Sequence, residues 1–151
     1  MNRAKLKAEL AADEGRRLLA YRDSLGLFTV GVGHLLGTLK RMDSITDDEC
    51  DALLERDIDH AEKLARKVLD PLDFDSMTDT RQRALVNMAF NRGQHLATST
   101  KILPAIRLAV QTGNDLDWAL VPQAMAGSTW AKQVGARAVR LGKMFATGED
   151  A

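Results

Sequence analysis

One short segment of alternating residues interrupts a chain that is otherwise patterned for helices, and this contrast constrains the fold more than any other feature. Between Leu18 and Gly33 the apolar period changes to two, a Ser-Leu-Gly turn ends at Gly26, and the segment LFTVGVG follows. This pattern is typical of a β-hairpin with Gly26 in its turn. We expect one apolar face and one nearly bare face on the second strand, formed respectively by Phe28, Val30 and Val32 and by Thr29, Gly31 and Gly33.

The rest of the chain repeats its apolar residues at helical spacing. This spacing predicts helices over residues 3–13, 46–69, 81–91, 99–112, 116–125 and 134–146, with residues 73–80 in a loop. The longest helix opens on Thr46-Asp-Asp-Glu49, which is the sequence of a capping box, and it stops at Asp70-Pro71. Its buried side is expected to consist of Cys50, Leu53, Leu54, Ile58, Ala61, Leu64, Ala65 and Val68.

Helices combined with one hairpin define an α+β fold class. The 151 residues are enough for one domain with a core that needs no disulfide or metal. We therefore expect a single domain over residues 1–151. A hairpin lobe at about 14–45 would be joined by a connecting helix at about 46–69 to a helical lobe at about 76–148.

Charge balance excludes a protein held on nucleic acid by bulk attraction. Lys and Arg total 21, as do Asp and Glu, and the sequence pI is about 6.8. The charge is nevertheless unevenly spread: residues 1–75 hold 12 basic against 16 acidic residues, and residues 76–151 hold 9 against 5. The basic C-terminal half could attract an anionic polymer.

Cys50 is the only cysteine, so an intrachain disulfide is impossible and a reducing compartment is expected. Its place on the apolar side of the long helix favours a buried, inert thiol over a nucleophile. One cysteine and three scattered histidines give no metal-binding pattern, and we expect neither a metal nor another cofactor. Residues 1–15 contain no apolar run, so we expect no signal peptide or membrane anchor.

Three reactive side chains occur in and before the hairpin. Glu14 closes the first helix, Asp23 ends the first strand, and Thr29 lies on the bare face of the second strand, so that Asp23 and Thr29 can meet on one face. Glycoside hydrolysis needs one carboxyl that gives a proton to the leaving oxygen and a second that stays charged. The alternative is structural, with Glu14 solvated, Asp23 capping the turn and the glycines serving only the hairpin.

The spacing of these residues resembles the active-site hairpin of the phage-type lysozymes, the T-even phage family of glycoside hydrolases. In that family a Glu, eight residues, an Asp, five residues and a Thr precede a Gly-x-Gly-His element, as Glu14, Asp23, Thr29 and the segment 31–34 do here. The segment 83–93, RALVNMAFNRG, resembles the family's central helix. Residues 128–130 and 137–140 resemble its C-terminal Trp and Arg-rich elements, so the resemblance covers nearly the whole chain.

This resemblance implies a muramidase that hydrolyses the β-1,4 bond between N-acetylmuramic acid and N-acetylglucosamine in peptidoglycan. Glu14 would be the general acid, and Asp23 with Thr29 would position the attacking water, which gives inversion at the anomeric carbon. Arg137 would lie near Glu14 and hold it electrostatically.

Further positions follow from the same resemblance. Leu35, Phe90 and Lys101 match family positions that line the substrate cleft, although Phe90 could equally be a core residue. We expect His34 to be structural rather than catalytic and to tie the hairpin to the long helix, with Asp57 as its partner.

In biological terms, the resemblance implies a phage endolysin that causes host cell lysis. We expect a monomer that stays in the host cytoplasm until a separate holin releases it to the periplasm, with peptidoglycan as its partner and no nucleic acid. The basic C-terminal helix, with Lys132, Arg137, Arg140 and Lys143, could instead touch membranes, but packing on the core explains its pattern better. Two alternatives stay open: a non-catalytic wall-binding module of the same fold, and an enzyme carried in a phage tail.

Overall fold

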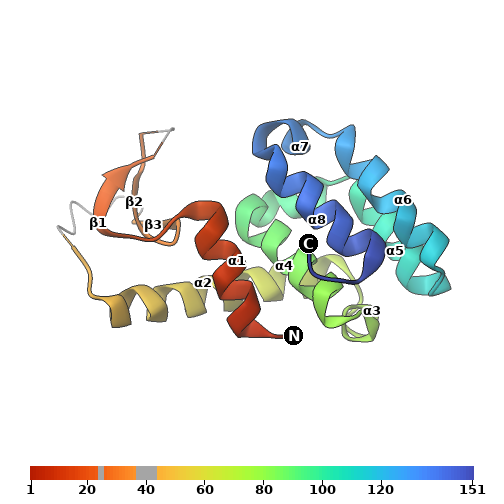
Figure 1. The fold of residues 1–151 in the computed structure, drawn as a ribbon, viewed down its shortest axis with the longest axis horizontal. Helices are drawn as coiled ribbons and strands as arrows, with labels where there is room; N and C mark the ends of the chain where they lie inside the picture. Colours follow the sequence, from red (N-terminus) through yellow and green to blue (C-terminus); the bar gives the residue numbers. More distant parts are fainter. Residues whose placement is uncertain (24–25, 37–43) are drawn as a thin grey trace. The chain divides into compact units, whose positions relative to one another are not determined.

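The computed structural model describes residues 1–23, 26–36 and 44–151, and the ribbon is drawn in Figure 1. Two compact units divide this part of the chain. One consists of residues 3–60, and the other of residues 1–2 together with residues 61–151. The expected fold class, α+β with a small sheet near the N-terminus, is confirmed. The single catalytic domain over residues 1–151 stays a prediction.

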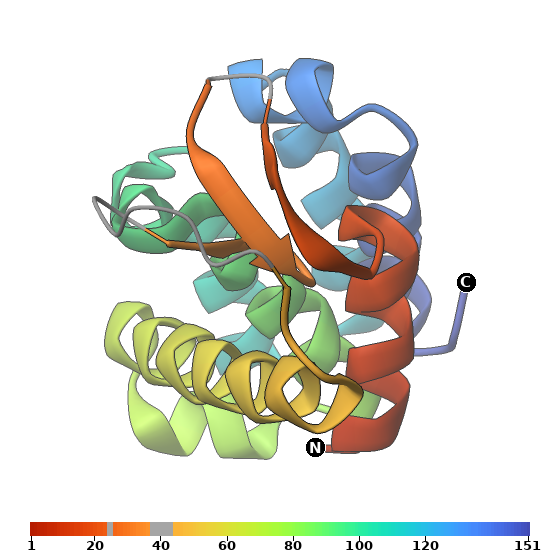
Figure 2. The same ribbon diagram turned by 90° about the vertical axis from the view of Figure 1, so that its left-hand side faces the viewer.

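The unit of residues 3–60 contains α1 (Arg3–Glu14), β1 (Arg17–Arg22), β2 (Phe28–Gly31), β3 (His34–Leu35) and the first part of α2 (Asp47–Val68). The expected hairpin is present as the antiparallel pair β1–β2, and β3 adds to the free edge of β2 in the order β1-β2-β3. Figure 2 shows this sheet facing the viewer, with α1 at its side and α2 beneath it. The hairpin turn falls partly on residues 24–25, which lie outside the described residues.

The second strand is shorter than the sequence predicts. We expected it to continue to Gly33, but the chain turns after Gly31 and returns as β3. Gly31 and Gly33 adopt φ values of 65° and 72°, which favour glycine and allow the tight reversal. The bare glycine face was therefore a wrong prediction: a Cβ added to Gly31 would lie 3.2 Å from Sγ of Cys50.

The first part of α2 supports the sheet from below. Its capping box is present: Thr46 N donates to Oε2 of Glu49 at 2.7 Å, and Glu49 N donates to Oγ1 of Thr46 at 3.2 Å. The predicted apolar side is buried except for Leu53, which is half-buried. Burial raises the pKa of the Cys50 thiol, which fits an inert side chain.

The larger unit is helical. It holds the end of α2 followed by α3 (Pro71–Ser76), α4 (Asp79–Arg92), the 3₁₀ helix η1 (Gly93–Thr98), α5 (Ile102–Thr112), α6 (Asp115–Ala126), α7 (Thr129–Val134) and α8 (Ala136–Thr147). We predicted a loop over residues 73–80, and this was wrong. Asp70 accepts a hydrogen bond from Leu72 N at 3.0 Å and Pro71 takes the first helical position, so Asp70-Pro71 starts α3 as well as ending α2.

The short helix α7 was also missed. Residues 128–134 carry no helical apolar repeat of useful length, and the helix depends on its cap and on one buried ring. Ser128 accepts from Ala131 N at 3.0 Å, and Trp130 is only 5% exposed. Gly135 ends α7, so the last helix begins at Ala136 rather than at residue 134.

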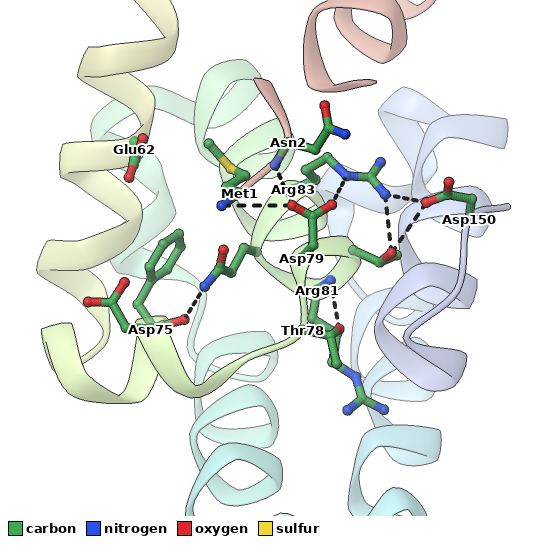
Figure 3. A network of polar contacts seen from close by, with 12 residues as sticks. Met1, Asn2, Glu62, Asp75, Thr78, Asp79, Arg81, Arg83 and Asp150 are labelled. Atoms are coloured by element: carbon green, nitrogen blue, oxygen red, sulfur yellow. Dashed lines mark hydrogen bonds and ion pairs between the residues drawn. The ribbon is translucent and has the colours of Figure 1, made fainter. Parts of the chain in front are cut away.

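Helix α4 forms the centre of this unit. Every residue from Thr80 to Ala89 is buried, including the polar ones. Figure 3 shows how Arg83, which is fully buried, is accommodated: Nε donates to Oδ2 of Asp79 at 2.8 Å, and Nη2 contacts Asp150 and Thr80. Paired acceptors thus compensate the buried guanidinium.

Candidate active site

Glu14 is the last residue of α1, and its side chain packs against the turn that joins β2 to β3. A Cβ added to Gly33 would lie 3.5 Å from Cβ, Cγ and Oε2 of Glu14, which is ordinary van der Waals distance, so the Glu14 side chain lies directly beside this turn. The following segment is anchored by Arg16, which donates to Asp47 at 2.8 Å and to Asp51 at 2.7 Å. The end of α1 is thus fixed on two sides.

Asp23 lies at the far end of β1. Its Oδ1 accepts a hydrogen bond from Leu27 N at 2.9 Å, and its own N donates to Leu27 O at 2.9 Å. Gly26 N donates to Asp23 O at 3.0 Å. The turn-capping contact that the structural alternative predicted is present. The same contact fixes the orientation of the carboxylate, so it is also compatible with a catalytic role.

Thr29 is 3% exposed, and its Cα pairs with that of Tyr21 across the hairpin. Because Asp23 pairs with Leu27 two positions further along, Asp23 and Thr29 occupy diagonal positions on the same face of the sheet. The Thr29 hydroxyl makes one long contact, 3.5 Å from Oγ1 to Leu27 O. The unit of residues 3–60 therefore contains Glu14, Asp23 and Thr29 together.

The predicted contact between His34 and Asp57 is present. Nδ1 of His34 lies 2.8 Å from Oδ2 of Asp57, and both side chains are about three-quarters covered. The pair joins β3 to α2 at the residue that directly follows Gly33. This arrangement fits the structural role expected for His34.

The three positions suggested for substrate binding lie in different places. Leu35 is 53% exposed on β3 and lines a cavity of about 380 Å³ over α2. Phe90 is half-buried near the end of α4, and Lys101 is exposed at the start of α5, where it lines a second cavity of about 290 Å³. Leu35 belongs to one unit and the other two belong to the helical unit. Their binding roles stay predictions.

Arg137 is 8% exposed and is held by Asn87 of α4, a residue that the sequence reasoning did not single out. Nε donates to Oδ1 of Asn87 at 2.9 Å, and Nη2 donates to its carbonyl oxygen at 3.3 Å. The signal in the sequence is that Asn87 is a polar residue between the apolar residues Val86 and Met88, because a buried polar side chain needs a hydrogen-bond partner. Arg137 and Glu14 lie in different units, so their proximity stays a prediction.

The sequence analysis also missed the contact between Trp130 and Asn91 in the helical unit. Trp130 Nε1 donates to Oδ1 of Asn91 at 2.8 Å, and the guanidinium of Arg92 lies 5.8 Å from the Trp130 ring centroid. The end of α4 thereby fixes α7.

In the described part of the chain, no group of three or more His, Cys, Asp or Glu could hold a metal ion, and none of its helices combines the length and apolarity that crossing a membrane requires.

Comparison with known proteins shows which family this chain resembles. The family model described as phage lysozyme matches residues 11–141. Probable T4-type lysozymes 1 and 2 of Dictyostelium discoideum are 28% and 26% identical to this chain, and each alignment covers 95% of the chain and 94% of the relative. The pre-baseplate central spike protein Gp5 of Enterobacteria phage T4 is 28% identical over 92% of this chain and 27% of its own length. The matched range includes Glu14, Asp23, Thr29 and Arg137.

Proposed function

Since the chain belongs to the phage lysozyme family, we propose that it is an endolysin that cleaves the β-1,4 bond between N-acetylmuramic acid and N-acetylglucosamine. The family supports the coarser statement directly: this is a glycoside hydrolase of the lysozyme kind, and peptidoglycan is its substrate. The packing of Glu14 against the Gly33 turn carries the finer proposal, because a proton donor needs a fixed position.

In the proposed reaction Glu14 is the general acid. Its proton goes to the glycosidic oxygen as the bond from that oxygen to the anomeric carbon breaks. Asp23 and Thr29 hold a water on the other face of the sugar ring. The water oxygen bonds to the anomeric carbon, and one of its protons passes to the Asp23 carboxylate. Attack from the face opposite the leaving group inverts the configuration. The shared face of Asp23 and Thr29 on the hairpin supports this division of roles.

Arg137 is proposed as a positioning residue for Glu14, and Leu35, Phe90 and Lys101 are proposed to contact the glycan.

For the biological role, we propose that the monomer accumulates in the host cytoplasm, reaches the peptidoglycan through a holin, and lyses the cell without binding nucleic acid. The likeness to a spike protein favours a second candidate, an enzyme of the phage tail. Expression in the host cytoplasm with and without a holin separates the two, since only an endolysin lyses cells in step with holin opening.

The first test is the loss of turbidity of chloroform-treated Gram-negative cells. The wild type is compared with Glu14→Gln, which keeps the size of the side chain but removes the proton donor. Glu149→Gln, at an exposed carboxyl near the C-terminal end, is the matched control. We expect clearing by the wild type and the control only, with all three circular dichroism spectra alike. If Glu14→Gln also clears the suspension, lysis does not depend on Glu14 and another part of the chain causes it. If none of the three proteins clears it, a wall-binding module is favoured.

The stereochemical proposal has its own measurement. Proton NMR of a short glycan, recorded within the first minutes of cleavage, distinguishes the two anomers of the new reducing end before they equilibrate. Inversion of the β-linked bond yields the α-anomer first. An initial β-anomer would show a covalent intermediate instead, and Asp23 would then have to act as a nucleophile.

A further inference from the structure

Tyr21 lies on the same face of the small sheet as Asp23 and Thr29, and the hydrolysis proposed above gives it no role. Its Cα pairs with that of Thr29 across the hairpin, and Thr29 pairs in turn with Leu35 of β3. Side chains of residues that pair directly across neighbouring strands project from one face. Tyr21, Thr29 and Leu35 therefore form a row across all three strands, with Thr29 in the middle.

The Tyr21 ring is held in place by Arg17 of the same strand. The guanidinium carbon Cζ of Arg17 lies 4.4 Å from the ring centroid, which is a cation–π contact. Arg17 is exposed, and in the described part of the chain its side chain forms neither a hydrogen bond nor an ion pair. The ring contact is therefore the interaction that orders both side chains.

Tyr21 keeps groups that the fold does not use. The residue is half-buried, and its hydroxyl forms no hydrogen bond with any described residue. Phe28 is the other half-buried aromatic residue of the hairpin, but it pairs with Arg22 and so projects from the opposite face. Tyr21 is thus the aromatic residue that the sheet presents beside Thr29.

An ordered aromatic ring with a free hydroxyl matches the surface of a sugar. The face of the ring is electron-rich and attracts C–H groups that are polarised by neighbouring oxygens, as those of a pyranose are. The phenol hydroxyl can donate a hydrogen bond to a sugar oxygen. Because Arg17 already fixes the ring, little conformational freedom remains to be lost on binding.

We propose that Tyr21 contacts the glycan strand on the side of Thr29 opposite Leu35, and that Arg17 positions its ring for this contact. The inference rests on the proposed function for the identity of the ligand, because a polymer continues on both sides of the bond that is cleaved beside Asp23 and Thr29. The ring stacks on a sugar, and the hydroxyl donates to a sugar oxygen. Tyr21 binds substrate in this way and takes no proton during hydrolysis.

The opposite face of the same hairpin supplies a matched control. Cζ of Arg22 lies 4.5 Å from the Phe28 ring centroid, nearly the geometry of Arg17 and Tyr21. Tyr21→Leu and Phe28→Leu therefore remove comparable ring contacts from the two faces, and both should lower the stability of the hairpin.

Binding distinguishes the two faces. The ligand is a peptide-free tetrasaccharide of alternating N-acetylglucosamine and N-acetylmuramic acid, and every protein also carries Glu14→Gln so that the ligand is not cleaved. Calorimetric titration should show that Tyr21→Leu weakens binding about tenfold and that Phe28→Leu leaves it unchanged. An equal loss in both variants would make Tyr21 a structural residue and overturn the proposal.

The contact itself is measurable without any substitution at Tyr21, which is the one tyrosine of the chain. A Glu14→Gln protein that is deuterated everywhere except at tyrosine can be saturated selectively at the Tyr21 ring by NMR. We expect the saturation to reach sugar protons of the tetrasaccharide, and none to reach maltotetraose, the control glycan. No transfer to the tetrasaccharide at concentrations up to its solubility would overturn the proposal, even if Tyr21→Leu failed to fold.

Two further variants divide the contact into its parts. Tyr21→Phe keeps the ring and loses the hydroxyl, so it should weaken binding about threefold. Arg17→Gln removes the cation that holds the ring and should also weaken binding about threefold, whereas Arg17→Lys should recover most of the affinity. Wild-type affinity of Arg17→Gln would contradict the positioning role of Arg17.

Turnover separates this inference from the proposed function. With Glu14 intact, Tyr21→Leu is expected to raise KM for soluble, uncross-linked peptidoglycan about tenfold with kcat nearly unchanged, and Phe28→Leu should alter neither value. A fall in kcat at unchanged KM would contradict a binding role. If the wild type shows no turnover, the muramidase proposal fails, while saturation transfer still decides whether Tyr21 contacts a glycan.

Discussion

Arg137 of α8 is hydrogen-bonded to Asn87 of the central helix α4. Its Nε donates to the Asn87 side chain at 2.9 Å and its Nη2 to the Asn87 carbonyl oxygen at 3.3 Å. Asn87 is fully buried and Arg137 nearly so. A buried guanidinium keeps its charge only where acceptors replace the lost water, so the Asn87 side chain determines both the stability of the α4–α8 contact and the position of this cation.

Replacement of Asn87 by Ala is expected to destabilise the protein by about 1.5–3 kcal/mol, because a hydrogen bond to a buried charged group is lost. Asn87→Asp keeps an acceptor at the same place and should lose much less. Urea unfolding followed by circular dichroism at pH 7 measures both. Equal stability of Asn87→Ala and the wild type would mean that Arg137 finds other acceptors without cost.

Gly33→Ala tests the packing of the turn against Glu14. At φ 72° an alanine is strained, and because its Cβ would contact the Glu14 side chain at 3.5 Å, any shift of the turn that relieves the strain would move Glu14 as well. Gly113→Ala is the matched control, since Gly113 has φ 63° and nothing within 4 Å of an added Cβ. Both variants should lose about 1 kcal/mol of stability through backbone strain. Only Gly33→Ala should lose turnover on peptidoglycan. If both variants lose turnover equally, the Gly33 turn has no specific role in positioning Glu14.

Substitution of Thr29 tests the role of its hydroxyl in catalysis with little effect on folding stability. Thr29→Val keeps the shape of the side chain, and within the described residues the hydroxyl that it removes makes only the 3.5 Å contact to Leu27 O. We expect folding stability to change by less than about 1 kcal/mol. The value of kcat should fall about 100-fold if the hydroxyl holds the attacking water. Thr29→Ser, which retains the hydroxyl, should recover most of the activity. Full activity of Thr29→Val would leave Asp23 to position the water alone.

How far the sequence determines the fold depends on the length of each pattern. The long helix from Asp47 and the hairpin from Arg17 carry repeated periods and strong end signals, and both were predicted correctly. The short helices α3 and α7 have six residues each, too few for a period, and they are held by a cap and by one buried ring. The turn at Gly33 was missed because a glycine within an alternating run fits a strand and a reversal equally well.

Some contacts of the candidate site could be predicted from the sequence, and others could not. Residues separated by a fixed local spacing, such as Asp23 and Thr29, could be placed on one face from the hairpin pattern alone. The His34–Asp57 contact could also be anticipated, because His34 directly follows the predicted hairpin and Asp57 lies within the predicted long helix. The Asn87–Arg137 and Asn91–Trp130 contacts could not be predicted in this way. They depend on contacts between helices far apart in sequence, such as the 50 residues between Asn87 and Arg137.

The last prediction concerns acid stability, through the ion pairs that join α1 to α2. Hydrogen bonds from Lys7 and then from Arg3 lower the pKa of Glu55 below the ordinary value of 4.5 for a glutamate. The unfolded chain therefore takes up this proton before the folded one does. The stabilisation is fully present above about pH 4.5 and is lost as the pH falls through the folded pKa.

Glu55→Gln should remove this contribution. Because Glu55 is 40% exposed, screening by water limits the effect to about 0.5 kcal/mol at pH 6. The difference in unfolding free energy between the wild type and Glu55→Gln should shrink toward zero as the pH falls below 4.5 and through the folded pKa of Glu55. Urea titrations at half-unit pH steps measure it, with Glu149→Gln as the exposed control. A difference that stays constant over this range would mean that Glu55 acts through packing, because the loss of an ion pair must follow the titration of its carboxyl.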